Sequence, residues 1–173
     1  MMDEIKVQIK YTAEDMQKSY DVFYKKVYSV RTYLLLAFGI ISFLAGVGFL
    51  IHSVIFEFTN YFSWFLIVYG LFLIVYHFIR LKTTGKRMFK KLHDFSSPFD
   101  YIFNSEGFSG KGSETKSEST WNYFKKYIIN DDIILLCPNK FRFNFFPKKY
   151  FTDEEFGQLK IWIKAKISNT EKL

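Results

Sequence analysis

The sequence is poor in the residues that carry most metal and redox chemistry. It contains one cysteine, Cys137, and three histidines, His52, His77 and His93, in 173 residues. A lone cysteine excludes an internal disulfide and a zinc site built from several cysteines. No two histidines have the His-x-x-x-His spacing that places two metal ligands on one helix face. We therefore expect no bound metal ion and no cofactor.

Catalytic motifs are also missing. The sequence has no nucleophile elbow, no dinucleotide-binding fingerprint and no paired set of carboxylates. Residues 107–113, Gly-Phe-Ser-Gly-Lys-Gly-Ser, lack the Gly-x-x-x-x-Gly-Lys-Ser/Thr spacing of a phosphate-binding loop, so we interpret them as a hairpin tip. Cys137 ends an apolar strand without a histidine nearby, which favours buried packing over a nucleophilic role. We predict that the chain is not an enzyme.

Charge is almost absent from one long part of the chain. Between Tyr33 and Ile79 the only charged residue is Glu57, and no proline interrupts the segment. Its two uncharged stretches, 33–56 and 58–79, each exceed the ~20 residues with which a helix crosses a hydrocarbon core of ~30 Å. The sequence therefore predicts a transmembrane helical hairpin over residues 33–79, with Glu57 in its solvated turn.

Positive charge flanks this hairpin and is missing from its connection. The chain has a net charge of +7, and lysines and arginines gather at 18–31 and 80–91. Because positive flanks stay on the cytoplasmic side, we expect a multi-pass protein with both termini in the cytoplasm. The first 32 residues are polar and charged, which predicts no cleavable signal peptide.

A basic cluster follows the second predicted span directly. Its members are Lys82, Lys86, Arg87, Lys90 and Lys91. Near anionic headgroups each cation gains about 1 kcal/mol, which favours contact between this cluster and anionic lipid of the bilayer. Alternatively, the cluster only sets the topology. In a membrane protein a basic balance indicates lipid more often than nucleic acid, so we expect no nucleic-acid partner.

Small residues and histidines in the predicted hairpin also have two interpretations each. The first span carries a stripe of small residues: Gly39, Ser42, Ala45, Gly46 and Gly48. Small residues let helix backbones approach closely, either at Ser63 and Gly70 of the second span or at the seam of a homo-oligomer. His52 and His77 lie near the ends of the spans, where packing at the membrane interface is favoured over a functional role.

The N-terminal segment predicts a strand followed by a helix. Residues 5–11 alternate strictly between apolar and polar side chains, which is typical of a half-buried strand. We expect this strand to pair with the C-terminal sheet, because an isolated strand leaves its backbone groups unpaired. Thr12 can cap the following helix. Neither glycine nor proline separates that helix from the first span, so the two are predicted to form one continuous rod.

The second span is also predicted to continue into the cytoplasm. Leu81, Met88, Leu92 and Phe95 recur at helical spacing, with Gly85 at the missing position, and residues 96–98 end the helix. We expect this extension to pack against the apolar residues of the N-terminal helix, from Met16 to Val30, as an antiparallel stalk.

From Phe99 the period of the pattern changes to two, which is typical of strands. Phe99, Tyr101 and Phe103 are predicted to share one face. A turn at 106–107 and an exposed loop at 110–113 follow. Further strands are expected at 120–129, 133–137 and 140–146, with turns at 130–132 and 138–139. Within the last strand the predicted inner face consists of Phe141, Phe143 and Phe145.

The C-terminal end predicts a capped helix. Residues 152–155, Thr-Asp-Glu-Glu, form a capping box. The helix that follows has an apolar face made of Phe156, Leu159, Ile163 and Ile167, with Trp162 beside it. Trp121 opens an aromatic strand and is predicted to fill the core rather than bind a ligand. Antiparallel strands closed by one C-terminal helix are the layout of a pleckstrin-homology-like (PH-like) barrel.

This order of elements resembles the YcxB-like family of bacterial membrane proteins. The resemblance rests on Glu106-Gly107-Phe108, on Trp121 after a Ser/Thr-rich segment, and on residues 146–151, Phe-Pro-Lys-Lys-Tyr-Phe, before the last helix. The family pattern is an aliphatic-Pro-Lys-x-x-Phe signature, so Phe146 departs from it. The resemblance covers nearly the whole chain and implies an architecture and a location in the bacterial cytoplasmic membrane, but no reaction.

The expected fold class is an α+β membrane protein, with a transmembrane hairpin and a PH-like cytoplasmic β module. Its expected parts are a strand and juxtamembrane helix (1–32), the hairpin (33–79), a second juxtamembrane helix (80–97) and the β module (98–173). Two functions stay open. One is a membrane-tethered module that binds an unknown protein or lipid partner. The other is a small accessory or immunity-type subunit that acts through its transmembrane helices. Either allows a homo-oligomer.

Overall fold

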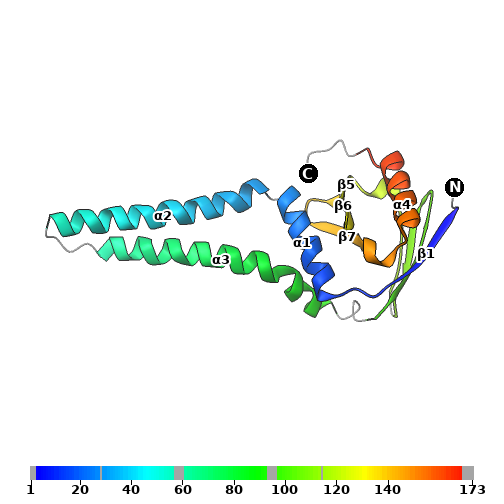
Figure 1. The fold of residues 1–173 in the computed structure, drawn as a ribbon, viewed down its shortest axis with the longest axis horizontal. Coiled ribbons are helices and arrows are strands. Elements are labelled where there is room, and N and C mark those ends of the chain that lie inside the picture. The colour runs from blue at the N-terminus through cyan, green and yellow to red at the C-terminus, as the bar shows by residue number, and fades with distance from the viewer. Residues whose placement is uncertain (1–2, 28, 57–60, 93–96, 114, 169–173) are drawn as a thin grey trace. The chain divides into compact units, whose positions relative to one another are not determined.

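The computed structural model describes residues 3–27, 29–56, 61–92, 97–113 and 115–168. Within them the chain is α+β, with two long apolar helices and two antiparallel sheets (Figure 1). The helices are α1 (Ala13–Val27), α2 (Ser29–Ile55), α3 (Tyr61–Lys91) and α4 (Asp153–Lys166). The strands are β1 (Glu4–Ile9), β2 (Phe99–Asn104), β3 (Gly107–Lys111), β4 (Lys116–Thr120), β5 (Lys126–Ile129), β6 (Ile133–Asn139) and β7 (Arg142–Pro147). Two short 3-10 helices are η2 (Trp121–Tyr123) and η3 (Lys148–Tyr150).

The chain divides into two compact units. Unit 1 combines residues 1–27 with residues 85–173, and unit 2 consists of residues 28–84. Unit 1 is therefore built from both ends of the chain. The apolar helices are inserted between the first strand of unit 1 and its second.

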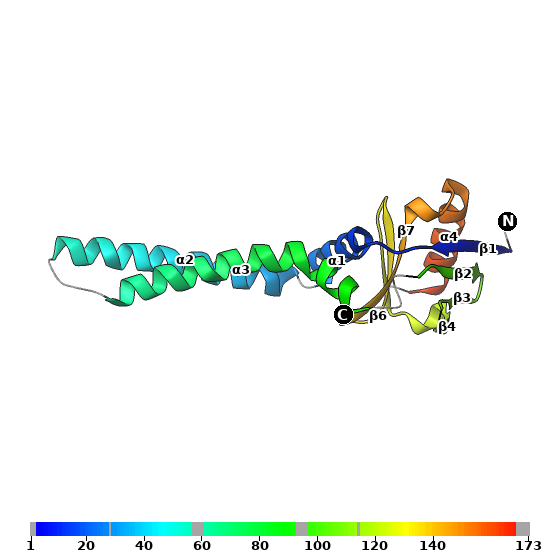
Figure 2. The ribbon, with the colours of Figure 1, turned by 90° about the horizontal axis from the view of Figure 1, so that it is seen from below.

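Sheet A of unit 1 has the strand order β1-β2-β3-β4. β1 pairs antiparallel with β2, so that Ile5 lies opposite Phe103 and Ile9 lies opposite Phe99 (Figure 2). Ile5 and Ile9 are fully buried, as the alternation of polar and apolar residues predicts. The prediction that the N-terminal strand pairs with the C-terminal sheet is confirmed.

Sheet B has the strand order β5-β6-β7, and both of its faces are covered. On one face Phe146 packs against Phe103 and Phe108 of sheet A, with ring centroids 5.0 and 5.2 Å apart. On the other face Phe143 packs against Tyr20 and Phe23 of α1, at 5.1 and 4.5 Å. A strand covered on both faces is apolar throughout, which accounts for the unbroken run Ile-Ile-Leu-Leu-Cys in β6.

Trp121 lies in the core between the sheets, as predicted. Its side chain is 1% exposed, and its indole N–H donates to the backbone oxygen of Asn104 at 3.0 Å. The ring packs against Phe108, with centroids 5.8 Å apart. α4 covers the same core with the predicted face of Phe156, Leu159 and Ile163. Its capping box is formed, because the Thr152 side chain accepts from Glu155 N and the Glu155 side chain accepts from Thr152 N.

Asparagines turn the chain at three of the strand connections. The side-chain oxygens of Asn104, Asn130 and Asn139 each accept from the backbone N–H groups two and three residues further on. These side-chain hydrogen bonds occupy backbone N–H groups of the turn, where the pairing between strands has ended. The predicted turn at 130–132 is confirmed. The turn predicted at 138–139 is wrong, because β6 continues through Asn139 and the chain turns at residues 140–141.

Several predicted strand boundaries need correction. Residues 120–129 do not form one strand, because η2 separates the polar strand β4 from β5. The predicted exposed loop at 110–113 begins too early, since Gly110 and Lys111 belong to β3 and Gly110 is buried against Tyr101. Phe141 does not share the inner face with Phe143 and Phe145, because it lies in the turn and is 71% exposed.

The predicted stalk is also partly wrong. α1 places Phe23 and Tyr20 on sheet B, so its apolar face covers the sheet. It comes close to the C-terminal part of α3 at Gln17, whose side chain accepts from Gly85 N at 3.0 Å. A Cβ on Gly85 would lie 2.3 Å from Gln17 Cα, which explains why this position of the pattern is a glycine. The prediction that α1 and α2 form one rod falls on Tyr28, which lies outside the described residues. Glu57, His93 and Phe95, named in other predictions, also lie outside them.

In unit 2, α2 and α3 pack closely through small residues. A Cβ on Gly46 would lie 2.9 Å from Ser63 O, and a Cβ on Gly70 would lie 2.5 Å from Phe43 N. The interpretation of the small stripe as a contact between the two helices is confirmed for Gly39 and Gly46, and Ser42 is buried. Ala45 and Gly48 are exposed and lie outside this contact.

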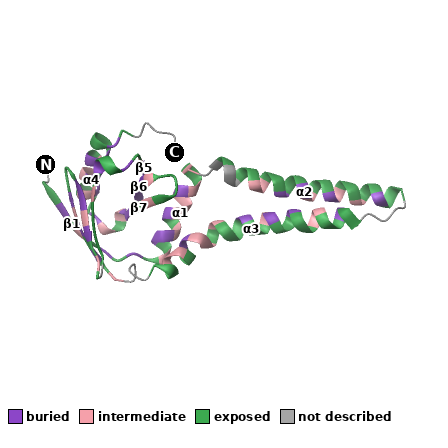
Figure 3. Cartoon of the chain, turned by 180° about the vertical axis from the view of Figure 1, so that it is seen from behind, coloured by how far each residue is buried: buried purple, intermediate pink, exposed green. Residues whose placement is uncertain are grey.

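Both apolar helices leave most of their surface uncovered (Figure 3). By length and composition, Tyr33–Ile55 and Tyr61–Lys91 are able to cross a membrane, and only 17% and 22% of their most apolar windows are buried. A core helix of a soluble protein is mostly buried instead. The two helices therefore permit a membrane location.

Candidate functional site

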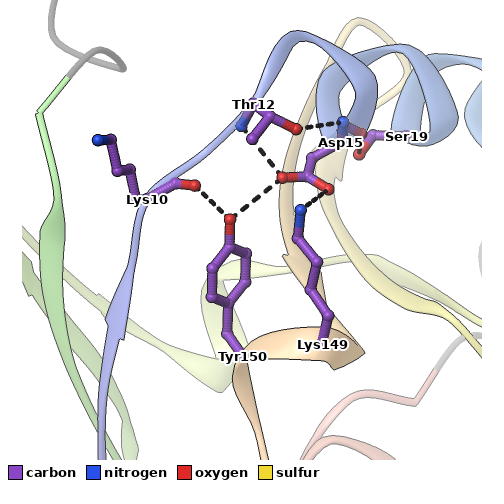
Figure 4. Close-up of polar contacts among 6 residues, drawn as sticks. All are labelled: Lys10, Thr12, Asp15, Ser19, Lys149 and Tyr150. Atoms are coloured by element: carbon purple, nitrogen blue, oxygen red, sulfur yellow. Dashed lines mark hydrogen bonds and ion pairs between the residues drawn. The ribbon is translucent and has the colours of Figure 1, made fainter.

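The best-formed polar cluster of the described chain surrounds Asp15, in the first turn of α1. Its carboxylate is 6% exposed and forms an ion pair with Lys149 of η3, with Oδ1 and Nζ 2.8 Å apart (Figure 4). The other oxygen accepts from Thr12 N at 3.0 Å and from the Tyr150 hydroxyl at 3.3 Å. The Tyr150 hydroxyl has one proton and shares it between this carboxylate oxygen and the backbone oxygen of Lys10. A buried charge of this kind needs both an ionic partner and hydrogen bonds, and Asp15 has both.

The local sequence explains why Asp15 occupies this position. Thr12 and Asp15 cap α1 reciprocally, because the Thr12 hydroxyl accepts from Asp15 N at 3.2 Å while Asp15 accepts from Thr12 N. Ser19, one turn later, donates its hydroxyl to Asp15 O at 2.6 Å. On the other side, β7 ends at Pro147, and η3 directs Lys149 and Tyr150 toward Asp15. The cluster thus fastens the connection between β1 and α1 to the end of sheet B.

Burial and the neighbouring charge act in opposite directions on the lysine. Burial lowers the pKa of Lys149, but the hydrogen bond and the charge of Asp15 outweigh it, so the pKa is raised overall. Burial and the nearby Asp15 charge raise the pKa of Tyr150. Lys149 is therefore charged and Tyr150 is neutral near pH 7, which is the state that the hydrogen bonds require.

A recess of about 500 Å³ opens beside this cluster, between α1, η3 and the connection from β5 to β6. Its walls carry charges of both signs, from Asp15, Asp21, Asp132, Lys18, Lys148 and Lys149. Val22, Ile133 and Phe151 give it apolar surface. Its volume lies within the range of small-molecule sites, but its charged lining differs from their mostly apolar walls. Such a recess suits a polar partner that offers groups of both charges.

The two neighbouring lysines of η3 have different roles. Lys149 holds the buried Asp15, whereas Lys148 pairs with the exposed Asp153 at 2.7 Å. The backbone of Lys148 also donates to Asp132 O at 2.8 Å. The aromatic residues of the same sequence stretch, Phe146 and Phe151, lie in the core. Residues 146–151 therefore join three parts of unit 1.

The structure places the predicted basic cluster on the C-terminal part of α3. All five members, Lys82, Lys86, Arg87, Lys90 and Lys91, are exposed. Lys82, Lys86 and Lys90 recur every four residues and so follow one side of the helix. The cluster is available to solvent or to a headgroup layer, and contact with anionic lipid stays a prediction.

Cys137, His52 and His77 are the remaining residues that the sequence offered as candidates for chemistry. Cys137 is fully buried, and burial raises the pKa of its thiol to about 12. A thiol with that pKa is almost entirely protonated near pH 7 and is a poor nucleophile. His77 is buried and His52 is exposed. No group of three histidine, cysteine, aspartate or glutamate residues that could hold a metal occurs within the described ranges.

Sequence reasoning missed the role of Asp15. The spacing of Thr12 and Asp15 was the available signal, because a carboxylate three residues after a capping threonine closes a capping box. Its partner Lys149 lies 134 positions further along the chain, and no local pattern pairs the two.

Comparisons with protein-family models, with curated proteins and with solved structures give no match to this chain. The resemblance to YcxB-like proteins therefore stays a prediction from the sequence motifs.

Proposed function

We propose that this protein is an integral membrane protein that holds a PH-like binding unit at the cytoplasmic face of the bilayer. The observation that carries the proposal is the uncovered apolar surface of α2 and α3. Exposed side chains along both helices include Phe38, Leu44, Phe65 and Phe72, each more than half exposed. Water disfavours such surface, whereas a hydrocarbon layer accepts it.

The order of the strands supports the PH-like part of the proposal. Four strands form sheet A, three form sheet B, and α4 follows as the last helix. Among the described residues, this order supports the proposal of a pleckstrin-homology-like unit whose first strand is followed by α1 and the two apolar helices. Lysine and arginine on both flanks of the hairpin favour a cytoplasmic position of unit 1.

The recess beside Asp15 is the surface that we propose for a partner. Lys18 and Asp132 line it and are exposed, so they are accessible to a bound molecule. Asp15 and Lys149 hold unit 1 together and are poor choices for a binding test. A partner segment with both acidic and basic groups would complement the lining.

Capture of the tagged full-length chain from native membranes tests this proposal. The wild type, Lys18→Glu and Asp132→Lys are compared with Lys111→Glu, an exposed lysine of β3 outside the recess lining. We expect partners seen with the wild type and with Lys111→Glu to be lost from the two recess variants. Equal recovery with all four chains would contradict binding at the recess, and extraction of the wild type by a salt wash without detergent would contradict membrane insertion.

A further inference from the structure

The turn between β6 and β7 exposes an aromatic ring between two cations. Phe141 is 71% exposed, whereas Phe145 and Phe146 of the same hairpin are 4% and 1% exposed. Lys140 and Arg142 flank it, and both are exposed. The Lys140 ammonium lies 5.2 Å from the centre of the Phe141 ring. An exposed ring with a basic border has the composition of a surface that enters a lipid headgroup layer.

The turn is held in a defined conformation. The Asn139 side-chain oxygen accepts from Phe141 N at 2.8 Å and from Arg142 N at 3.0 Å. Asn139 and Arg142 also close the pairing of β6 with β7. The ring is therefore presented at the tip of a paired hairpin and not on a long loop, so little ordering is required when it binds.

Within unit 1, the strand that follows the hairpin tip lies on the C-terminal half of α1. Phe143, two residues from Phe141, packs on Tyr20 and Phe23, which belong to the last two turns of α1. Lys25 and Lys26 stand exposed in the final turn of α1, directly before the sequence of unit 2 begins. Two independent segments thus place basic side chains at the same end of unit 1.

The sign of the charge identifies the surface that this tip fits. Residues 133–152 contain no aspartate or glutamate, and Asp131 and Asp132 lie at the opposite turn of sheet B. Each basic side chain near an anionic bilayer shifts the equilibrium toward docking by about fivefold. A negatively charged lipid surface can accommodate the ring among its headgroups and also attract the cations. An uncharged lipid surface can accommodate only the ring.

We propose that the β6–β7 tip docks onto the anionic leaflet, with Phe141 in the headgroup layer and Arg142, Lys140 and the end of α1 on phosphate groups. This inference rests on the proposed function, because the hairpin of unit 2 is what brings the leaflet close. It adds a second lipid contact, on a different element from the basic cluster of α3. Docking would fix unit 1 against the membrane rather than leave it free on its tether.

Fluorescent labels on the full-length chain test the proposal. The Phe141→Cys variant is labelled and placed in vesicles of phosphatidylglycerol and phosphatidylcholine that carry a lipid-bound quencher. The matched control is Ile161→Cys, which replaces an apolar residue of α4 that is 58% exposed and stands beside Lys160. The unlabelled wild type is the blank, since its only cysteine is buried.

Docking predicts that the label at 141 is quenched strongly and the label at 161 is not. Quenching at 141 should fall in pure phosphatidylcholine, in high salt and in an added Arg142→Glu background. Lys164→Glu on α4 should leave it unchanged. Equal quenching at 141 and 161 in anionic vesicles overturns the inference. A second measurement uses a water-soluble quencher. If this quencher is kept from the label at 141 equally well in detergent and in vesicles, the inference is also overturned, because protein rather than lipid then covers the tip.

The two proposals fail in different ways. If the chain is removed from the vesicles by a salt wash, membrane insertion is wrong and the inference falls with it. If the chain resists the wash while the label at 141 stays in water, the tether holds and only the docking of the tip is wrong.

Discussion

At the scale of single residues, Tyr11 joins three parts of unit 1. Its ring packs on Phe145 at 4.6 Å, and its hydroxyl donates to Phe145 O at 3.0 Å. The hydroxyl also lies 3.3 Å from the Tyr101 hydroxyl. Burial raises the pKa of Tyr11 well above its usual 10.0, and burial likewise raises the pKa of Tyr101. Both phenols therefore resist ionisation while the unit is folded.

These shifts predict a loss of stability in alkaline solution. A tyrosine with a raised folded pKa contributes stability that is fully present below the unfolded pKa of 10.0 and is lost as the pH rises through the folded pKa. The free energy of unfolding should thus fall above pH 10.0. Tyr11→Phe should cost about 1 kcal/mol near neutral pH and make the alkaline fall less steep. Thermal unfolding of the full chain in detergent over this pH range measures both effects.

Tyr123→Phe is the control for this prediction, because Tyr123 is 59% exposed. It should change neither the neutral stability nor the alkaline fall. An identical pH dependence in the wild type and in Tyr11→Phe would show that Tyr11 is not responsible.

The adjacent lysines of η3 give a second residue-scale prediction. Lys149→Met removes the ionic partner of the buried Asp15 and should destabilise unit 1 by about 2–3 kcal/mol. Lys148→Met removes an ion pair with the exposed Asp153 and should leave the melting temperature unchanged. Urea unfolding of both variants in detergent compares them directly. Equal effects of the two substitutions would contradict a structural role for the Asp15 ion pair.

At the scale of elements, glycines mark where helices need close contact and where they do not. Gly85→Ala places a Cβ 2.3 Å from Gln17 Cα, so α1 and α3 must separate, at a cost of about 1–3 kcal/mol. Gly157→Ala in α4 meets no atom within 4 Å and should stabilise the helix by about 0.5–1 kcal/mol. Melting temperatures of the two variants should therefore move in opposite directions, and a stabilising Gly85→Ala would contradict the close approach.

The pairing of β1 with β2 predicts the result of a deletion. Removing residues 1–11 exposes the backbone of β2 and the core side chains Phe103 and Phe99, and it also removes Tyr11. Unit 1 should then become sensitive to limited proteolysis, whereas removing residues 1–3 should not affect it. A deleted chain as resistant as the full-length protein would show that β1 is dispensable for the sheet.

The elements that sequence predicted well are those with a strong apolar pattern. The alternation of residues 5–11, the apolar run of β6 and the capping box of α4 each depend on neighbouring residues, and each is present. β4 was missed, because Lys-Ser-Glu-Ser-Thr is an exposed edge without an apolar face. Phe141 was assigned to the wrong face, because an alternating pattern does not show where a strand ends. The Asp15 ion pair depends on contacts between distant segments, which local patterns do not reveal.

At the scale of the whole molecule, the two units differ in how much apolar surface they leave uncovered. Unit 1 hides its apolar side chains between two sheets and α4, while unit 2 leaves most of its apolar side chains uncovered. The proposed membrane hairpin places the connection between α2 and α3 outside the cell and unit 1 inside. Tyr61, 81% exposed at the start of α3, and Ser113, exposed after β3, then lie on opposite sides of the bilayer.

The most direct test of this arrangement is labelling with a membrane-impermeant maleimide on intact cells. Tyr61→Cys and Ser113→Cys are compared with the wild-type chain, which should stay unlabelled because burial raises the pKa of Cys137 to about 12. We predict labelling of Tyr61→Cys on intact cells, and labelling of Ser113→Cys only after the membrane is permeabilised. Labelling of Ser113→Cys on intact cells would contradict the proposed topology.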